Sequence, residues 1–202
     1  LRARRSLTAD ITRPEGQEIV KRLAAKADMI AVNKTEEDMA KLGLSYADLK
    51  AVNAAIIYGV ITPFGEEGPW KDLPDYDLIV MAKCGLQEKT GFPERPTKFG
   101  FPISYVYAGG RLTAGMMAAY LKAQETGEGM KVSCSIWQTM MELDDTFIEC
   151  FQGMNALPKR IGNGFPTTNP TDTFRCSNGW FTLSIGSDGQ WLSFVHEAGK
   201  DA

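Results

Sequence analysis

Short apolar runs alternate along this chain with stretches whose apolar residues recur at helical spacing. Met29–Val32 reads MIAV and Ala55–Ile61 reads AIIYGVI, and continuous β-branched runs of this kind are typical of buried parallel strands. A third strand is predicted at Val132–Ile136, and a long helix rich in small residues at Gly109–Gln124. The alternation predicts an α/β fold, in which an open, mainly parallel, Rossmann-like sheet carries helices on both faces.

Capping residues indicate where several helices begin. Thr12-Arg13-Pro14-Glu15 has the form of a capping box with proline in the first turn. Thr35 and Ser45 each precede a short amphipathic stretch and are predicted N-caps. Two further helices are expected over Tyr76–Leu86 and Trp137–Gln152.

The last quarter of the chain differs in composition, because glycine, threonine, asparagine and proline become frequent. Thr173–Cys176 and Trp180–Ile185 are predicted to pair as a hairpin around a Ser-Asn-Gly turn. We place a domain boundary within 155–170. The predicted organisation is therefore a large α/β domain at 1–157, then a linker and the start of a smaller α+β domain at 158–202.

Composition and charge exclude several classes of protein. Hydrophobic residues make up 44% and charged residues 23% of the chain, as in ordinary globular proteins, and the net charge of −3 favours neither nucleic acid nor an anionic membrane. No apolar run reaches the ~18 residues that a membrane-spanning helix needs. The four cysteines lie far apart and His196 is the single histidine, so we expect no metal site and reduced thiols in a cytoplasmic protein. The cysteines are Cys84, Cys134, Cys150 and Cys176.

Six segments together resemble one known family through their order and spacing. They read RRSLTADITRPEG, ADMIAVN, PFGEEGPW, PDYDLI, ETGEGMKV and RIGNGFP. The chain resembles family III CoA-transferases, the superfamily of formyl-CoA and carnitine CoA-transferases and of α-methylacyl-CoA racemase. Members of this family are longer on both sides, which implies that the chain is a fragment whose large domain lacks its first strand and helix.

The resemblance implies a nucleophile that this chain lacks. In the family, an aspartate attacks the donor thioester to give a mixed anhydride, and the released CoA thiolate returns to form an aspartyl thioester. The matching position within PISYVYAGGR is Tyr105, and its neighbours Ser104 and Val106 are not acidic either. A phenol with a reference pKa near ~10 is almost wholly protonated at pH 7. Packing into the vacated pocket therefore explains Tyr105 better than nucleophilic attack does.

Other polar residues were weighed as replacements. The racemase branch pairs its aspartate with histidine in a G-H-D motif, whereas this chain has Asp75-Tyr76-Asp77 and a distant His196, which we expect to be a surface or packing residue on a late helix. Asp77 matches an acidic position that supports the active site in transferases, and it is the secondary candidate for a catalytic carboxylate. A helix N-terminal carboxylate favoured by the dipole explains it equally well. Asp144 and Asp145 are expected to be solvated within a helix.

The resemblance also implies where coenzyme A would bind. In relatives, the segment matching Ala9, Asp10, Ile11 and Thr12 and an N-F-R-P-G turn after the next strand hold the nucleotide. Here that turn reads Asn33-Lys34-Thr35-Glu36-Glu37, so its glycine and proline positions are negatively charged and oppose phosphate. Asn33 remains, and Lys41 is a candidate phosphate contact that a solvated surface lysine explains as well. Coenzyme A and its thioesters are expected as substrates, with no tightly bound cofactor.

These observations favour a subunit of a CoA-transferase that acts on pairs of acyl-CoA and carboxylic acid. Relatives form interlocked dimers, which tolerate one inert chain if a homologous subunit supplies the aspartate, as in benzylsuccinate-type heteromeric transferases. This chain is then the non-catalytic partner in a hetero-oligomer. Three alternatives stay open: an active transferase that uses Asp77, a non-enzymatic acyl-CoA-binding or assembly protein, and another CoA reaction such as intramolecular transfer.

Overall fold

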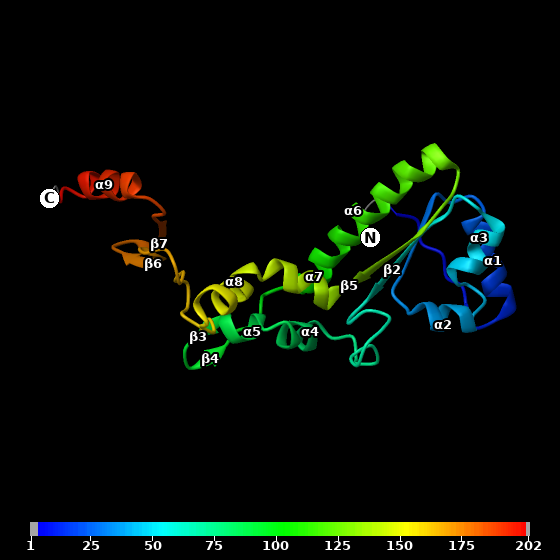
Figure 1. Cartoon of the computed structure of the whole chain (residues 1–202), viewed down its shortest axis with the longest axis horizontal. Helices are drawn as coiled ribbons and strands as arrows, with labels where there is room; N and C mark the ends of the chain where they lie inside the picture. The colour runs from blue at the N-terminus through cyan, green and yellow to red at the C-terminus, as the bar shows by residue number, and fades with distance from the viewer. Residues whose placement is uncertain (1–3, 201–202) are drawn as a thin grey trace. The chain divides into compact units, whose positions relative to one another are not determined.

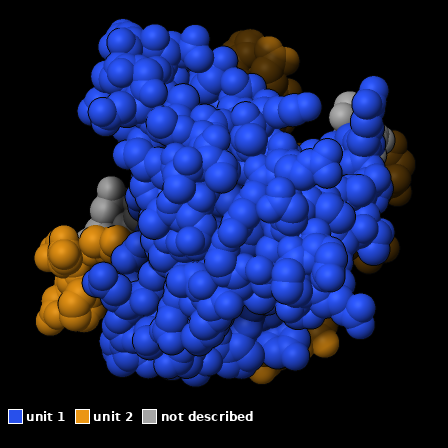
Figure 2. Space-filling view, turned by 90° about the vertical axis from the view of Figure 1, so that its right-hand side faces the viewer, with its two compact units in different colours: residues 1–84, 101–143 blue, residues 85–100, 144–202 orange. Residues whose placement is uncertain are grey.

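The computed structural model describes residues 4–200, without the side chains at 145–147 and 149. The chain folds into two compact units, which Figure 2 shows in blue and orange. The first unit comprises residues 1–84 and 101–143, and the second comprises residues 85–100 and 144–202. The domain limits expected from the sequence, 1–157 and 158–202, stay a prediction about the whole protein.

A three-stranded parallel sheet forms the centre of the first unit. The strands are β1 (Met29–Val32), β2 (Ile57–Thr62) and β5 (Lys131–Ser135), in the order β1-β2-β5. Both pairings are parallel, with Val32 opposite Val60 and Thr62 opposite Ser135. The three strands predicted from apolar runs are thus confirmed, each within two residues of its expected limits.

Three short helices cover one face of this sheet (Figure 1). They are α1 (Pro14–Ala24), α2 (Glu36–Lys41) and α3 (Tyr46–Val52). Their apolar side chains pack against the alternate residues of β2 that point to this face, because successive strand residues point to opposite faces. The buried cluster consists of Ala24, Met39, Leu44, Leu49, Tyr58 and Val60.

The opposite face carries the long helix α6 (Ile103–Thr126). The buried cluster there consists of Ile57, Leu112, Met116, Ala119 and Ala123. The helix comes so close to β2 that a methyl group added at Gly59 would lie 2.4 Å from Met116 Sδ. Helices therefore cover both faces, as predicted. The expected start at Gly109 was wrong, because α6 begins six residues earlier at Ile103.

Two of the three predicted N-caps are confirmed. The Thr35 hydroxyl accepts from the Asp38 amide at 3.2 Å, and Ser45 forms a complete capping box with Asp48. The predicted box at Thr12-Arg13-Pro14-Glu15 was wrong. The Thr12 hydroxyl donates to Asp10 Oδ1 at 2.6 Å, which turns it away from the helix, and α1 begins after Arg13 without a side-chain cap.

Both remaining helix predictions merged two elements. The helix expected over Tyr76–Leu86 is α4 (Asp77–Lys83), which ends before Gly85, and α5 (Leu86–Lys89) follows. Gly85 has a φ of 85°, a left-handed conformation that glycine adopts readily and that separates the two helices. The helix expected over Trp137–Gln152 is α7 (Ile136–Leu143) followed by α8 (Asp145–Met154).

Asp144 explains the second interruption and corrects its predicted solvation. Its side chain is fully buried and forms an ion pair with Lys89, so it lies between α7 and α8 rather than on a solvated helical face. The side chain of Asp145 is outside the part that the structure describes.

The second unit contains short elements. Its strands are β3 (Gly91–Phe92), β4 (Arg95–Pro96), β6 (Thr171–Cys176) and β7 (Gly179–Ser184), and its last helix is α9 (Asp188–Glu197). Strands β6 and β7 pair antiparallel with Cys176 opposite Gly179, which leaves Ser177 and Asn178 as a two-residue turn. The predicted hairpin is confirmed. His196 lies on α9 with its side chain 74% exposed, as expected for a surface residue.

Candidate functional site

A polar cleft of about 490 Å³ lies in the first unit beside the segments that follow β1 and β2. In open parallel sheets, ligands bind outside the carboxyl ends of the strands, so this is the expected place for a substrate. Six carboxylates line the cleft, from Glu36, Glu37, Asp38, Glu66, Glu67 and Asp72. Three lysines, Lys41, Lys71 and Lys131, share this lining.

The inner wall of the cleft is a network of hydrogen bonds and ion pairs centred on Glu66. Lys131 Nζ lies 2.9 Å from Glu66 Oε2 and 3.4 Å from Glu36 Oε2. The Glu66 carboxylate also accepts from the Ser133 hydroxyl at 2.7 Å and from the Glu36 amide at 2.8 Å. Glu36 Oε1 in turn accepts from the Tyr46 amide at 2.9 Å. These charges therefore connect α2, α3, β5 and the segment after β2.

The pKa values within this network reflect the same contacts. Burial raises the pKa of Glu66, but hydrogen bonds from Lys131, Ser133 and the Glu36 amide more than offset it and hold that pKa below its ordinary value. Burial lowers the pKa of Lys131. Its hydrogen bond to Glu66 and the negative charges of Glu66 and Glu36 outweigh burial and leave this pKa raised. Both groups are therefore charged at neutral pH and engaged with each other.

The outer wall is also paired. Lys41 Nζ lies 3.1 Å from Glu37 Oε1 and 3.3 Å from Asp38 Oδ1. Its hydrogen bond to Glu37, followed by that to Asp38, raises the pKa of Lys41. Within residues 4–200, Lys71 has no ion pair. The cleft thus has a single lysine that is not already paired with a carboxylate.

Of the six residues predicted to contact coenzyme A, Lys41 lines this cleft. Ala9, Asp10, Ile11 and Thr12 form the turn before α1, in which the Asp10 carbonyl accepts from the Arg13 amide at 3.2 Å. Gly16 packs on this turn so tightly that an added methyl group would lie 1.9 Å from the Asp10 carbonyl oxygen. Asn33 is exposed just after β1. Their assignment to coenzyme A stays a prediction.

Aromatic side chains hold the far end of the segment after β2. The Trp70 ring meets the Trp137 ring edge-on at 5.2 Å and the Phe64 ring at 6.1 Å. Lys83 Nζ lies 4.4 Å from the centre of the Trp70 ring, and Trp137 Nε1 donates to the Lys83 carbonyl at 3.2 Å. The segment is therefore fixed at one end by Glu66 and at the other by Trp70.

The first turn of α6 places Tyr105 beside two carboxylates. The Tyr105 hydroxyl donates to Asp75 Oδ1 at 2.9 Å. Its neighbour Ser104 is fully buried and donates to Asp77 Oδ1 through its hydroxyl at 2.5 Å and through its amide at 3.3 Å. Asp77, the first residue of α4, therefore serves as the acceptor for the N-terminus of α6.

These surroundings keep Tyr105 protonated. Burial, the hydrogen bond to Asp75 and the negative charges of Asp75 and Asp77 raise the pKa of Tyr105 to about 12. Ionisation would place a phenolate against these carboxylates, so the neutral phenol is the form present at physiological pH. A neutral phenol is a weak nucleophile toward a thioester.

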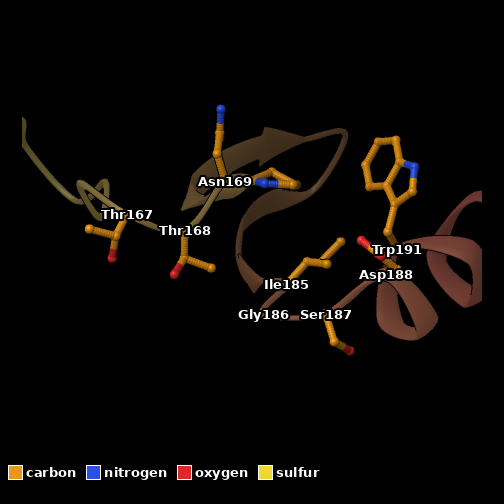
Figure 3. A pocket seen from close by; sticks show the side chains of 9 residues that line it. Thr167, Thr168, Asn169, Ile185, Gly186, Ser187, Asp188 and Trp191 are labelled. Atoms are coloured by element: carbon orange, nitrogen blue, oxygen red, sulfur yellow. The ribbon is translucent and has the colours of Figure 1, made fainter.

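The second unit has a separate pocket of about 670 Å³ (Figure 3). It is bounded by Thr167–Pro170, by Ile185–Asp188 and by Trp191 of α9. Ser187 caps α9 by accepting from the Gln190 amide at 3.4 Å. None of the sequence-predicted site residues lies in this pocket.

Neither a metal centre nor a membrane span is found in the described part of the chain. Within it, no three histidine, cysteine, aspartate or glutamate side chains are grouped so that they could hold a metal ion. Likewise, none of the helices that the structure describes combines the length and the apolar character needed to cross a bilayer.

Comparison with known proteins identifies the family. The model of CoA-transferase family III matches residues 1–202. The chain belongs to this family. It is 33% identical to the succinate–glutarate CoA-transferase of Agrobacterium fabrum, over 100% of the chain and 50% of that protein. It is 31% identical to the succinyl-CoA–D-citramalate CoA-transferase of Chloroflexus aurantiacus, over 93% of the chain and 47% of that protein.

Solved structures agree with this assignment. A CaiB/BaiF family protein from Brucella suis superposes with a TM-score of 0.84 at 31% identity, over 97% of this chain and 52% of that one. A Mycobacterium tuberculosis protein superposes with a TM-score of 0.82 at 26% identity, over 98% and 52%. The chain therefore spans about half the length of the relatives that it matches.

Sequence reasoning missed the two contacts that define these sites. Asp75 was noted in the segment aligned with the racemase motif and not as the partner of Tyr105, which lies 30 residues away. Glu66 appears in the sequence analysis only within the motif PFGEEGPW, although its place just after a central strand is a signal that it reaches the carboxyl edge of the sheet. Lys131 gave no comparable signal, because a lysine at a strand start is usually solvated.

Proposed function

We propose that the protein containing this chain is a CoA-transferase that acts on pairs of acyl-CoA and carboxylic acid, and that this chain is its non-catalytic subunit. The family supports transfer between thioesters and carboxylates, because relatives across the family carry CoA-transferase names. The enzyme is then a hetero-oligomer, in which a homologous subunit supplies the nucleophilic aspartate. A cytoplasmic location, expected from the cysteine usage, belongs to the same proposal.

The state of Tyr105 carries this proposal. Transfer through a mixed anhydride needs a carboxylate, and the side chain at the position matched to the nucleophile is a phenol whose pKa is raised to about 12. Its hydroxyl is directed at Asp75 rather than left open to a thioester carbon. The side chain at this position is therefore a neutral phenol, which cannot form the mixed anhydride.

Asp77 supports a second candidate function, an active transferase with a displaced carboxylate. Its Oδ1 lies 2.5 Å from the hydroxyl of Ser104, the residue next to Tyr105. The same contacts weigh against it, because a carboxylate that accepts two hydrogen bonds at the start of α6 is less nucleophilic and is needed to hold the helix. A non-enzymatic acyl-CoA-binding or assembly role would require neither Asp77 nor Tyr105 to react.

Native mass spectrometry of the full-length protein, purified from its own cells, tests the subunit composition. We expect a stoichiometric complex with a second family III chain that carries aspartate where this chain has Tyr105. A homodimer with transferase activity would contradict the proposal and favour Asp77. A homodimer without transferase activity would instead favour the binding or assembly role.

A further inference from the structure

We infer that the cleft beside β1 and β2 excludes coenzyme A, so that the residues lining it form no CoA-binding site in the assembled enzyme. The inference rests on the proposed function, because a two-chain transferase needs only the site of its catalytic chain. It also disagrees with what the family resemblance implied for Asn33 and Lys41. The disagreement arises from the charges that the cleft presents.

The charge of the cleft opposes a polyanion. Its six carboxylates and three lysines leave a formal charge of −3 at the edge of the sheet where a ligand is expected. Coenzyme A carries a 3′-phosphate and a 5′-diphosphate, and a like charge held within about 8 Å is only partly screened at physiological salt. A site for such a ligand would need unpaired cations, which most nucleotide sites supply with lysine, arginine or helix N-termini.

Two of the three lysines of the cleft are not available to a phosphate, and among the described residues Lys71 is the one lysine of the lining without an ion pair. Lys41 is paired with Glu37 and Asp38, and Lys131 with Glu36 and Glu66. A phosphate could recruit Lys131 only by displacing carboxylates that also hold the amides of Glu36 and Tyr46. Removing one partner from such a network leaves the others desolvated and unpaired, which is unfavourable.

The N-terminus of α2, which follows β1 directly, is also occupied. The Glu36 amide donates to Glu66 Oε1 at 2.8 Å, and the Asp38 amide donates to the Thr35 hydroxyl at 3.2 Å. The first turn of α2 carries three acidic side chains, Glu36, Glu37 and Asp38. A helix start that binds phosphate needs free amides and little negative charge, whereas here two first-turn amides are already bonded and three carboxylates lie beside them.

Photolabelling of the intact complex tests the inference. The full-length complex is irradiated with a photoactivatable coenzyme A analogue, and the labelled chain and peptide are identified by mass spectrometry. We expect label in the partner chain alone, and we expect unmodified coenzyme A to compete with it. Competable label within Ala9–Thr12 or Asn33–Lys41 of this chain would overturn the inference while leaving the hetero-oligomer intact.

The same measurement separates this inference from the proposed function. If the purified protein is a homodimer, the proposed function fails, and label or its absence on this chain still decides whether the cleft excludes coenzyme A. Calorimetric titration gives an independent readout, because a heterodimer should bind one coenzyme A for two chains. Two equivalent sites in a heterodimer would overturn the inference.

A charge variant shows that the carboxylates cause the exclusion. The triple variant Glu37→Gln, Glu67→Gln, Asp72→Asn removes three exposed negative charges from the cleft without touching Glu36 or Glu66. In water a unit charge at ~8 Å is worth roughly twofold in affinity, so the three together should raise coenzyme A labelling of this chain about tenfold at low salt. The gain should shrink as salt is added.

The matched control neutralises three exposed carboxylates outside the cleft. Glu15→Gln, Glu18→Gln and Glu125→Gln change the net charge by the same amount, and none of the three lines the cleft. We expect no gain in labelling. An equal gain in both variants would show that net charge rather than the cleft is responsible, and no gain in either would contradict exclusion by these carboxylates.

Discussion

The middle and the first turn of helix α6 differ in what their residues do. In the middle, small and flexible side chains allow close contact with the sheet, where Gly59 leaves room for Met116 and Gly115 lies against Val132. In the first turn, Ser104 and Tyr105 donate to carboxylates from the segment around α4. The packing that defines the fold is present in the middle of α6, whereas its first turn holds Tyr105 as a neutral phenol beside Asp75. Under the proposed function, fold and reaction would therefore depend on separate residues.

The largest effect should come from the middle of α6. Gly59→Ala in the full-length protein would bring a methyl group to 2.4 Å from Met116 Sδ, in a buried contact. The flexible Met116 side chain can partly move aside, so relieving this overlap should cost about 1–2 kcal/mol of unfolding free energy. Denaturant unfolding followed by circular dichroism measures the loss.

Gly110→Ala, on α6 itself, is the matched control for the substitution on β2. An added methyl group at Gly110 meets no atom within 4 Å, and alanine favours a helix over glycine. We expect a gain of about 0.5–1 kcal/mol in unfolding free energy. A loss in Gly110→Ala as large as that in Gly59→Ala would contradict close packing of α6 on β2 as the cause.

A smaller effect is expected at the start of α6. Asp77→Ala removes the acceptor for the Ser104 hydroxyl and amide and should cost about 1 kcal/mol, as the loss of an N-cap does. Asp77→Asn keeps an acceptor oxygen and should cost less. The unfolding free energy of both variants measures this difference.

The activity of the same two variants distinguishes an Asp77 that positions helix α6 from an Asp77 that acts as the nucleophile. If Asp77 only positions α6, the Asn variant of the complex should keep its kcat, and the Ala variant should lose activity only as far as it loses folded protein. Complete loss of turnover in a folded Asp77→Asn complex would instead identify Asp77 as the nucleophile.

The smallest effect on stability is expected for Tyr105→Phe. The variant loses one hydrogen bond to the exposed Asp75 and should cost below about 1 kcal/mol. The proposed function predicts unchanged transferase activity of the complex, because in that proposal the hydroxyl takes no part in the reaction. A turnover assay on the purified complex checks this.

Titration of Tyr105 gives the sign of its pH dependence. The folded-state pKa of about 12 lies above the ordinary value of 10, so this residue contributes stability that is present below pH 10 and is lost as pH rises through about 12. Difference absorbance of tyrosinate between the protein and Tyr105→Phe should show a midpoint near 12. A midpoint at or below 10 would contradict the burial and the carboxylate contacts.

The sequence predicted the sheet well because its signal is local. The continuous apolar runs of β1 and β2, and the caps at Thr35 and Ser45, depend on residues within one or two turns of each other. The early start of α6 depends on Asp77, which lies 27 residues from Ser104, and the break at Asp144 accompanies its ion pair with Lys89, 55 residues away. Local patterns do not contain such contacts.

In the candidate site, too, local features could be predicted from the sequence and contacts between distant residues could not. The match of Tyr105 to the nucleophile position stays a prediction from the order of motifs, whereas the acidic residues of the turn Asn33–Glu37 can be read from the sequence directly. The contact of the Glu36 carboxylate with the Tyr46 amide and that of the Glu36 amide with Glu66 could not be predicted from the sequence. A Glu-Glu pair at the start of a helix is usually solvated. The structure therefore changes the interpretation of this turn, from two repulsive charges to one structural and one exposed carboxylate.

Trapping of the acyl-enzyme tests the central claim most directly. The full-length complex, turning over an acyl-CoA donor, is quenched with hydroxylamine, and the chain that carries the hydroxamate is identified by peptide mass spectrometry. We predict modification of an aspartate in the partner chain and none on this chain. A hydroxamate at Asp77, or an acyl group on Tyr105, would show that this chain performs the chemistry itself.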